Sequence, residues 1–287
     1  RATERLAGKA PAARLQLAMG AVRRALGREA GRDGELAPVV EAARRGVEWL
    51  LGLQNRDGGW PTFCRGWGKL PFDRSGADLT AHALRALYMW RAVRPRPIER
   101  AIQRGWSYLL RRQRPDGSWV PLWFGQQDHP DEENPVYGTA RVLLAGDIPA
   151  VGETEAVARG YRYLAAVQRE DGGWGGGLQP DGRPVPGSAS SVEETAVVVE
   201  SLLGRQYDPA LQTPLAKGLQ WLTEAVLADR HRESVPIGFY FAKLWYYEKL
   251  YPVIFTVSAL GQAMRRRLPP FSREGSEFGN SISAPTN

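Results

Sequence analysis

The sequence has few of the residues from which metal centres, disulfides and redox sites are built. Its 287 residues include one Cys, three His and three Met. Because Cys64 has no second Cys to pair with, an intrachain disulfide is excluded, and the sequence is compatible with a reducing compartment. The Cys and His residues are too dispersed to predict a zinc site. We therefore expect no zinc centre.

Long apolar runs are missing as well. No stretch reaches the roughly 18 apolar residues that indicate a membrane-spanning helix. The net charge is +7, but the basic residues are scattered, and the densest basic run is Arg265-Arg266-Arg267. Without a recognised module, nucleic acid is not predicted as a partner. The charge favours a solvated face with a modest attraction to anionic membrane surfaces, on which the protein would lie peripherally.

Tryptophan, by contrast, is abundant, and part of it belongs to a repeat. Each copy has a basic residue followed by Gly, a segment ending in Gln, then Asp-Gly and a Trp. The copies start 59 and 55 residues apart, and a fourth start, without the Gln and Trp, follows after 58 more. Four starts at one period predict an array of similar units. The copies are Arg45-Gly46 with Gln54, Asp57-Gly58 and Trp60; Arg104-Gly105 with Gln113, Asp116-Gly117 and Trp119; and Arg159-Gly160 with Gln168, Asp171-Gly172 and Trp174; the fourth start is Lys217-Gly218.

The residues of each copy have a physical interpretation. In the first copy, Val47, Leu50 and Leu51 recur at helical spacing before the Gln. The Asp-Gly pair ends the helix, because Gly tolerates the left-handed conformation. The Trp has a large apolar face to bury and one N–H to satisfy. We expect the Gln and the Trp to connect one helical hairpin to the next.

The spacing of apolar residues and of Gly and Pro predicts an all-α protein. Long helices joined by short links at a roughly 57-residue period favour an α/α toroid, an α6/α6-like barrel. A full ring needs about twelve helices and the chain supplies about ten, so the ring is predicted to be incomplete. Three regions are expected: a diverged or truncated N-terminal edge (1–37), the toroid (38–268) and a flexible tail (269–287). The expected helices lie near 38–54, 77–93, 97–113, 134–146, 153–168, 191–205, 214–228, 236–249 and 252–267.

The repeat resembles the QW motif of the triterpene cyclases, and over roughly residues 40–268 the chain looks most like the C-terminal half of a squalene-hopene cyclase. The resemblance implies the toroid of terpenoid cyclases and protein prenyltransferases. It also implies protonation-initiated cyclisation of a linear polyprene such as squalene, without a cofactor, in hopanoid-type triterpenoid biosynthesis. A peripheral position on the cytoplasmic side of the membrane follows from the same resemblance. The oligomeric state is open, with a homodimer as one alternative.

Asp78 and His82 form the candidate catalytic pair. Four residues apart, they lie on one face of a predicted helix and can touch. A carboxylate that orients a His is suited to holding a proton, but Asp78 can equally be a first-turn acid and His82 a satisfied core residue. In squalene-hopene cyclases an Asp-Val-Thr-Ala-His segment supports the catalytic acid. Asp78-Leu79-Thr80-Ala81-His82 resembles that segment.

Aromatic residues in three segments are candidates for the lining of a polyprene site. In the family such rings face the carbocation, which a π-face stabilises. The segment 238–247, which ends near Tyr251-Pro252, resembles the family's C-terminal aromatic helix; ordinary helix packing is the alternative for every ring. The candidates are Phe63, Trp123, Tyr137, Phe239, Tyr240 and Tyr247.

One departure from the family concerns the acid itself. Its Asp-x-Asp-Asp-Thr-Ala motif is expected about 45 residues before Gly58-Gly59-Trp60, where this chain has Ala12-Ala13-Arg14-Leu15-Gln16. Either the acid belongs to a missing upstream half, or the chain is not a working cyclase and is instead a non-catalytic isoprenoid-binding toroid. A protein prenyltransferase subunit, which would need zinc, is a third hypothesis. The acidic segment 128–133 fits a solvated loop better than a magnesium site, and Glu193-Glu194-Thr195-Ala196 fits a helix start.

Overall fold

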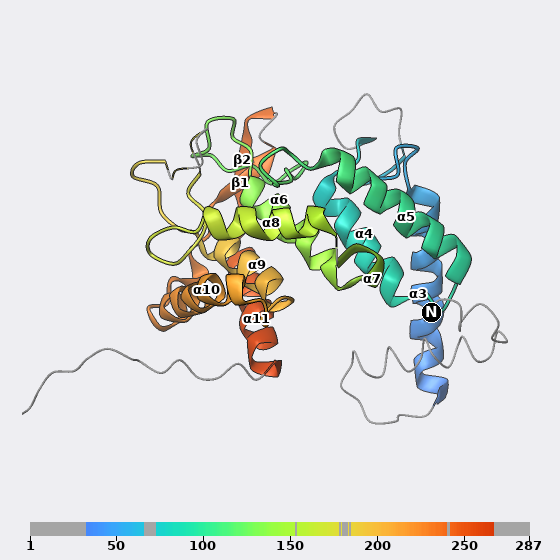
Figure 1. Ribbon diagram of the computed structural model, residues 1–287. Helices are drawn as coiled ribbons and strands as arrows, with labels where there is room; N and C mark the ends of the chain where they lie inside the picture. The colour runs from blue at the N-terminus through green and yellow to red at the C-terminus, as the bar shows by residue number, and fades with distance from the viewer. Residues whose placement is uncertain are drawn as a thin grey trace, which may run out of the picture.

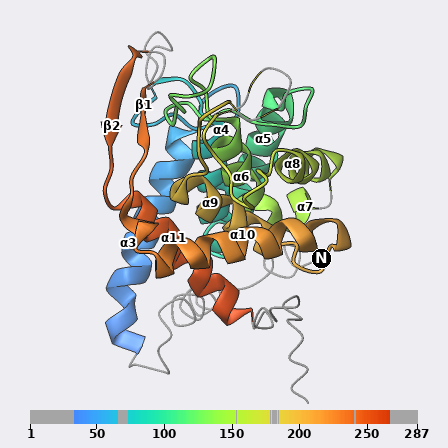
Figure 2. The same cartoon turned by 90° about the vertical axis from the view of Figure 1, so that its left-hand side faces the viewer.

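The computed structural model describes residues 33–65, 73–152, 154–177, 179, 183, 185–239 and 242–266. They form two layers of helices that follow one another in an arc (Figures 1 and 2). The N-terminal segment 1–32 and the tail 267–287 lie outside the described residues, so the predicted N-terminal edge is mostly outside them too.

Inner and outer helices alternate along the chain. The inner helices contact one another in the order α4, α6, α9 and α11, while α5 packs against α4, α8 against α6 and α10 against α9. Every residue of α6 and of α9 is buried, as expected for helices covered on all sides. The outer helices are α3 (Asp33–Leu53), α5 (Pro95–Arg112), α8 (Glu155–Ala166) and α10 (Pro209–Leu227), and the inner ones are α4 (Ala77–Met89), α6 (Pro135–Leu143), α9 (Val192–Leu203) and α11 (Tyr251–Arg265).

This arrangement is the predicted α/α toroid, in the form of an arc within the described residues. α3 and α11 lie at opposite ends of the arc (Figure 1). Three short elements complete it: η2 (Leu144–Asp147) and α7 (Pro149–Gly152) follow α6, and η3 (Arg230–Arg232) follows α10.

The repeated Gln connects neighbouring units, as predicted. Nε2 of Gln54 donates to the carbonyl of Gly58 at 2.8 Å and to that of Ala101, in the next outer helix, at 2.9 Å. Gln113 makes the same pair of bonds to Gly117 and Ala156, and Gln168 to Gly172 and Pro214. Each Gln therefore closes its own turn and holds the following unit.

The Asp-Gly turn has the predicted geometry. Gly58, Gly117 and Gly172 have φ angles of +96°, +94° and +90°. Residues other than Gly rarely adopt such angles. The Trp that follows donates its indole N–H back to its own helix, as Trp60 does to Leu50 at 2.9 Å. Its backbone N–H donates to the hydroxyl of a Thr in the next inner helix. In the first copy, Trp60 N donates to Thr80 Oγ1 at 3.0 Å.

The predicted helix over 236–249 is wrong. The segment forms a hairpin of β1 (Pro236–Phe239) and β2 (Leu244–Tyr247), paired antiparallel with Ile237 opposite Tyr246. Aromatic residues favour the extended strand conformation. Gly238 has a φ of +156°, and a β-carbon at this position would lie 2.1 Å from the carbonyl oxygen of Leu244. The hairpin therefore requires Gly here. The carbonyl of Gly238 accepts from Gly125 N at 3.2 Å, which fixes the hairpin to the loop before α6.

Candidate functional site

The inner helices all begin on the same side of the arc, because each is reached through an outer helix that runs the opposite way. Their first turns carry Asp78 in α4, Tyr137 in α6, Glu193 in α9 and Tyr251 in α11. Helix N-termini carry partial positive charge, which favours negative charge nearby. Asp78 and Tyr137, two of the predicted site residues, therefore lie on the same side of the arc although they belong to different repeats.

Asp78 is a buried first-turn acid. Its side chain is 3% exposed, and Oδ1 accepts from Leu122 N at 3.4 Å. Burial raises the pKa of the carboxyl, while the backbone hydrogen bonds and the charge of Arg141 act in the opposite direction. The Asp78 side chain thus connects α4 to the loop after the second Trp.

His82, one turn later, has an exposed side chain. Surrounding protein atoms nevertheless displace enough water to lower the pKa of its imidazole to about 4, and Arg141 and Arg85 add to the shift. Its side chain is therefore neutral at pH 7. In the part of the chain that the structure describes, no hydrogen bond joins His82 to Asp78. Their support of an acid stays a prediction.

Three of the candidate aromatic residues, Phe63, Trp123 and Phe239, come together. The ring of Trp123 meets Phe239 edge-on with 4.2 Å between centroids, and Phe63 at 6.1 Å. The indole N–H donates to Thr62 Oγ1. Phe239 continues to Tyr246 at 6.1 Å. The four rings of Phe63, Trp123, Phe239 and Tyr246 form what we call the hairpin cluster.

Tyr137 belongs to a second group of rings. It stacks on Phe124 with 4.2 Å between centroids, and Phe124 reaches Tyr251 at 5.7 Å. Tyr251 in turn stacks on Phe255 at 5.2 Å. Burial raises the pKa of Tyr137. These four residues are the inner cluster, and sequence reasoning had proposed only Tyr137 among them.

The other two aromatic candidates, Tyr240 and Tyr247, do not join either cluster in the part of the chain that the structure describes. Tyr240 lies outside the described residues. Tyr247 is 63% exposed, and it has no ring contact among the described aromatic residues. Because side chains alternate along a strand, it is Tyr246 that contacts Phe239. The helix assumed from the sequence gave the wrong periodicity.

Arg141 is the residue that sequence reasoning missed. Its side chain is 8% exposed, although it is the only charged residue of α6. The Cζ atom lies 4.4 Å from the ring centroid of Phe255 and 5.0 Å from that of Tyr137. The buried Nε has no hydrogen-bond partner. The sequence signal that could have identified Arg141 was the presence of one charged residue within the otherwise largely apolar segment 135–143.

Two buried glutamates start α9. Oε2 of Glu194 accepts from Ser191 Oγ at 2.8 Å and from Gln126 Nε2 at 3.2 Å, which connects the helix start to the loop before α6. Oε1 of Glu193 accepts from Val235 N at 3.0 Å, and its other oxygen has no partner. Burial raises the pKa of Glu193 to about 7. Helix-start roles were predicted; the connections to distant loops were not.

The acidic loop 128–133 supplies ion pairs. Glu133 binds Arg114 at 2.5 Å, and Glu132 pairs with Lys243 at the tip of the hairpin. Within the described ranges, no three His, Cys, Asp and Glu side chains gather as a metal site. Nor does any described helix combine the length and the apolar character needed to cross a bilayer.

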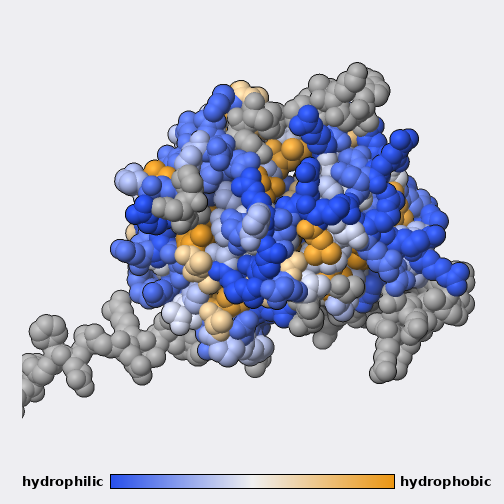
Figure 3. Space-filling model, turned by 45° about the horizontal axis from the view of Figure 1, so that its top comes forward, coloured by the Kyte–Doolittle hydropathy of each residue, from blue (hydrophilic) through white to orange (hydrophobic). Residues whose placement is uncertain are grey.

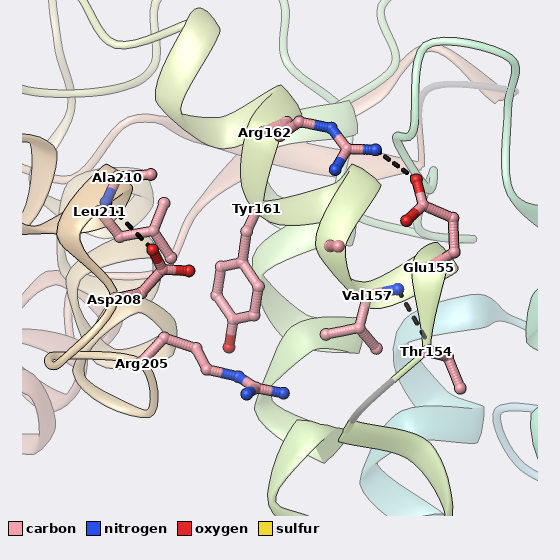
Figure 4. A pocket seen from close by; sticks show the side chains of 10 residues that line it. Thr154, Glu155, Val157, Tyr161, Arg162, Arg205, Asp208, Ala210 and Leu211 are labelled. Atoms are coloured by element: carbon pink, nitrogen blue, oxygen red, sulfur yellow. Dashed lines mark hydrogen bonds and ion pairs between the residues drawn. The ribbon is translucent and has the colours of Figure 1, made fainter.

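A surface pocket of roughly 410 Å³ lies elsewhere, between the start of α8 and the start of α10. Tyr161 points into it beside Arg205 and Asp208, and Arg162 pairs with Glu155 on its far side (Figure 4). Outer helices start where inner helices end, so this pocket and the aromatic clusters lie at opposite ends of the hairpins. It is therefore separate from the candidate site.

The model of the squalene-hopene cyclase C-terminal domain matches residues 20–265. The chain belongs to this family. A terpene cyclase-glycosyl transferase fusion protein of Humicola fuscoatra is 30% identical to this cyclase domain over 80% of the chain, which covers 19% of that protein. A probable squalene-hopene cyclase of Sinorhizobium fredii is 28% identical over 74% of the chain, which covers 34% of that protein. A drimenyl diphosphate synthase of Streptantibioticus cattleyicolor is 33% identical, over 69% of the chain and 32% of its own length.

A solved structure supports the fold. The ent-copalyl diphosphate synthase of Streptomyces platensis superposes with a TM-score of 0.55 at 25% identity, over 75% of this chain and 37% of that one. The cyclase domain described here thus spans about a third or less of the length of these relatives.

Proposed function

We propose that this chain forms the polyprene-binding part of a terpene cyclase that closes rings by protonation of a linear polyprene such as squalene. The observation that carries the proposal is the meeting of the two aromatic clusters and the Asp78 helix start at one end of the inner layer. Membership of the cyclase family supports the reaction type.

The chemistry assigns a different task to each group. Ring faces such as that of Trp123 stabilise a carbocation for the reason that they stabilise any cation. The buried rings of Trp123, Tyr137 and Phe255 keep water from the cation until the last step, whereas Phe63 is 67% exposed. Because burial raises the pKa of Asp78, this carboxyl is weaker than the acid that protonates an alkene. We assign it, with His82, the support of an acid that lies outside the described residues.

The names of relatives support a prenyl substrate but differ in its type. Squalene-hopene cyclases act on squalene by name, and drimenyl diphosphate synthases make a diphosphate. We propose a peripheral position on the cytoplasmic side of a membrane, which suits an insoluble substrate. On the face seen in Figure 3, apolar areas are separated by hydrophilic ones.

A second candidate function is isoprenoid binding without turnover. Arg141 favours it, because its guanidinium already occupies the faces of Tyr137 and Phe255 that would otherwise meet a carbocation. An internal cation there opposes the formation of a second one nearby.

Product analysis distinguishes the two functions. The chain is incubated with squalene in detergent, alone and with the N-terminal half of a squalene-hopene cyclase, and cyclic products are sought by gas chromatography and mass spectrometry. We expect product only when the second protein supplies the acid. Asp78→Asn should then lower the yield, whereas Asp208→Asn, at the cap of the outer helix α10, should leave it unchanged. Absence of product in both incubations would refute the cyclase and leave the binding protein.

A further inference from the structure

Arg141 is a buried cation for which the described protein provides no anion. It is 8% exposed, and no carboxylate lies within ion-pair distance of it in the described part of the chain. Its Nε is buried without a hydrogen-bond partner. An unpaired buried charge is costly, and such groups are usually paired.

The surroundings of Arg141 come from three inner helices. The rings of Tyr137 in α6 and Phe255 in α11 flank the guanidinium at 5.0 and 4.4 Å. On the α4 side its charge acts on both Asp78 and His82. The guanidinium therefore lies buried between α4, α6 and α11, close enough to His82 for its charge to act on the imidazole.

Asp78 is a carboxyl on which the charge of Arg141 acts, but its side chain is engaged elsewhere. Its Oδ1 accepts from the backbone of Leu122. Burial moves its pKa upward, toward the neutral acid. The aromatic faces offset part of the charge of Arg141, but they do not satisfy the Nε–H.

We propose that Arg141 binds an anionic headgroup of phosphate type on an isoprenoid, with the prenyl chain lying along the aromatic clusters. The planar fork of a guanidinium suits phosphate oxygens. This inference rests on the proposed polyprene site and narrows its ligand: squalene has no anionic group, whereas a prenyl diphosphate has one.

The test compares two ligands that differ only in the headgroup. Binding of geranylgeranyl diphosphate and of geranylgeraniol to the 287-residue chain is measured by isothermal titration calorimetry in one detergent. We expect the diphosphate to bind at least about tenfold more tightly, the effect of a charge-assisted hydrogen bond. Arg141→Met should remove this preference, and Arg141→Lys should retain part of it.

Arg112 provides the matched control. It also lies over a tyrosine ring, that of Tyr108 at 5.6 Å, but in the outer helix α5. Arg112→Met should keep the full preference for the diphosphate. Circular dichroism verifies that each variant is folded.

The outcomes separate this inference from the proposed function. Equal binding of alcohol and diphosphate, or a preference that persists in Arg141→Met, would overturn the role of Arg141 and leave the polyprene site intact. Failure of both ligands to bind would overturn both. Binding of inorganic diphosphate alone, abolished by Arg141→Met, would confirm the anion site and reject the prenyl chain.

Discussion

A β-carbon at Gly105 would lie 2.8 Å from Cζ3 of Trp60. Gly105 starts the second copy of the repeat and Trp60 ends the first, so the Gly of one unit receives the indole of the unit before it. Gly160 meets Trp119 at 2.8 Å and Gly218 meets Trp174 at 2.6 Å in the same way. The fourth start therefore serves the third copy, although it has no Gln or Trp of its own.

Gly105→Ala is expected to destabilise the fold by about 1–3 kcal/mol, because the added methyl overfills a packed contact. Gly46→Ala is the matched control: it has the same place in the first copy, and a β-carbon there meets nothing within 4 Å. Ala at Gly46 should stabilise by up to about 1 kcal/mol through helix propensity. Urea denaturation measures both, and equal effects would contradict the contact.

Gln113→Leu should cost about 1–3 kcal/mol, because the carbonyls of Gly117 and Ala156 both lose their donor. Gln220, an exposed residue of α10 whose amide donates to Glu224, is the control. Gln220→Leu should change stability by less than about 0.5 kcal/mol. The same denaturation assay compares them. Similar losses in the two variants would show that the Gln does not connect the units.

The connections between units were predictable because the residues that make them recur at fixed spacing. Gln54 and Trp60 lie on either side of an Asp-Gly turn, and the same pattern returns twice. The hairpin was not predictable from periodicity, since a run of aromatic residues fits a helix or a strand. The clue in the sequence was Gly238, because the hairpin leaves no room for a β-carbon at this position.

The environment of Arg141 could not be derived from local sequence. Its neighbours Asp78 and Phe255 belong to other helices, more than sixty residues away on one side and more than a hundred on the other. Only the packing of α4, α6 and α11 along the arc brings them together. The resemblance to the cyclase family predicted Asp78 and Tyr137 as site residues, but it did not predict the guanidinium of Arg141 near them.

Glu193 should make stability depend on pH. Its pKa of about 7 lies above the value of an ordinary carboxyl, so the folded protein holds a proton that the unfolded chain has lost. Its contribution is thus fully present below about pH 4.5 and is lost as the pH rises through about 7. Glu193→Gln should be more stable than the parent at pH 8, by up to about 3 kcal/mol.

The control for Glu193 is Glu99→Gln, which changes an exposed glutamate of α5. Thermal unfolding is followed between pH 4 and 8. The advantage of Glu193→Gln should shrink toward acid pH, and Glu99→Gln should parallel the parent throughout. An advantage independent of pH would mean that the carboxyl does not titrate in this range.

His82 reports on the position of Arg141. Its pKa of about 4 lies below the ordinary value, so the folded state binds fewer protons, and its contribution to stability is lost as the pH falls from about 6.5 toward 4. Nitrogen-15 NMR of the three histidines, with His82→Gln for assignment, measures this pKa. Arg141→Met should raise it, because one positive charge is removed, and Arg85→Met should raise it less. The protein atoms that displace water around His82 remain in both variants, so neither variant should restore the ordinary pKa of the imidazole. If Arg141→Met left the pKa of His82 unchanged, the guanidinium would lie too far away to share an anion site with this side of α4.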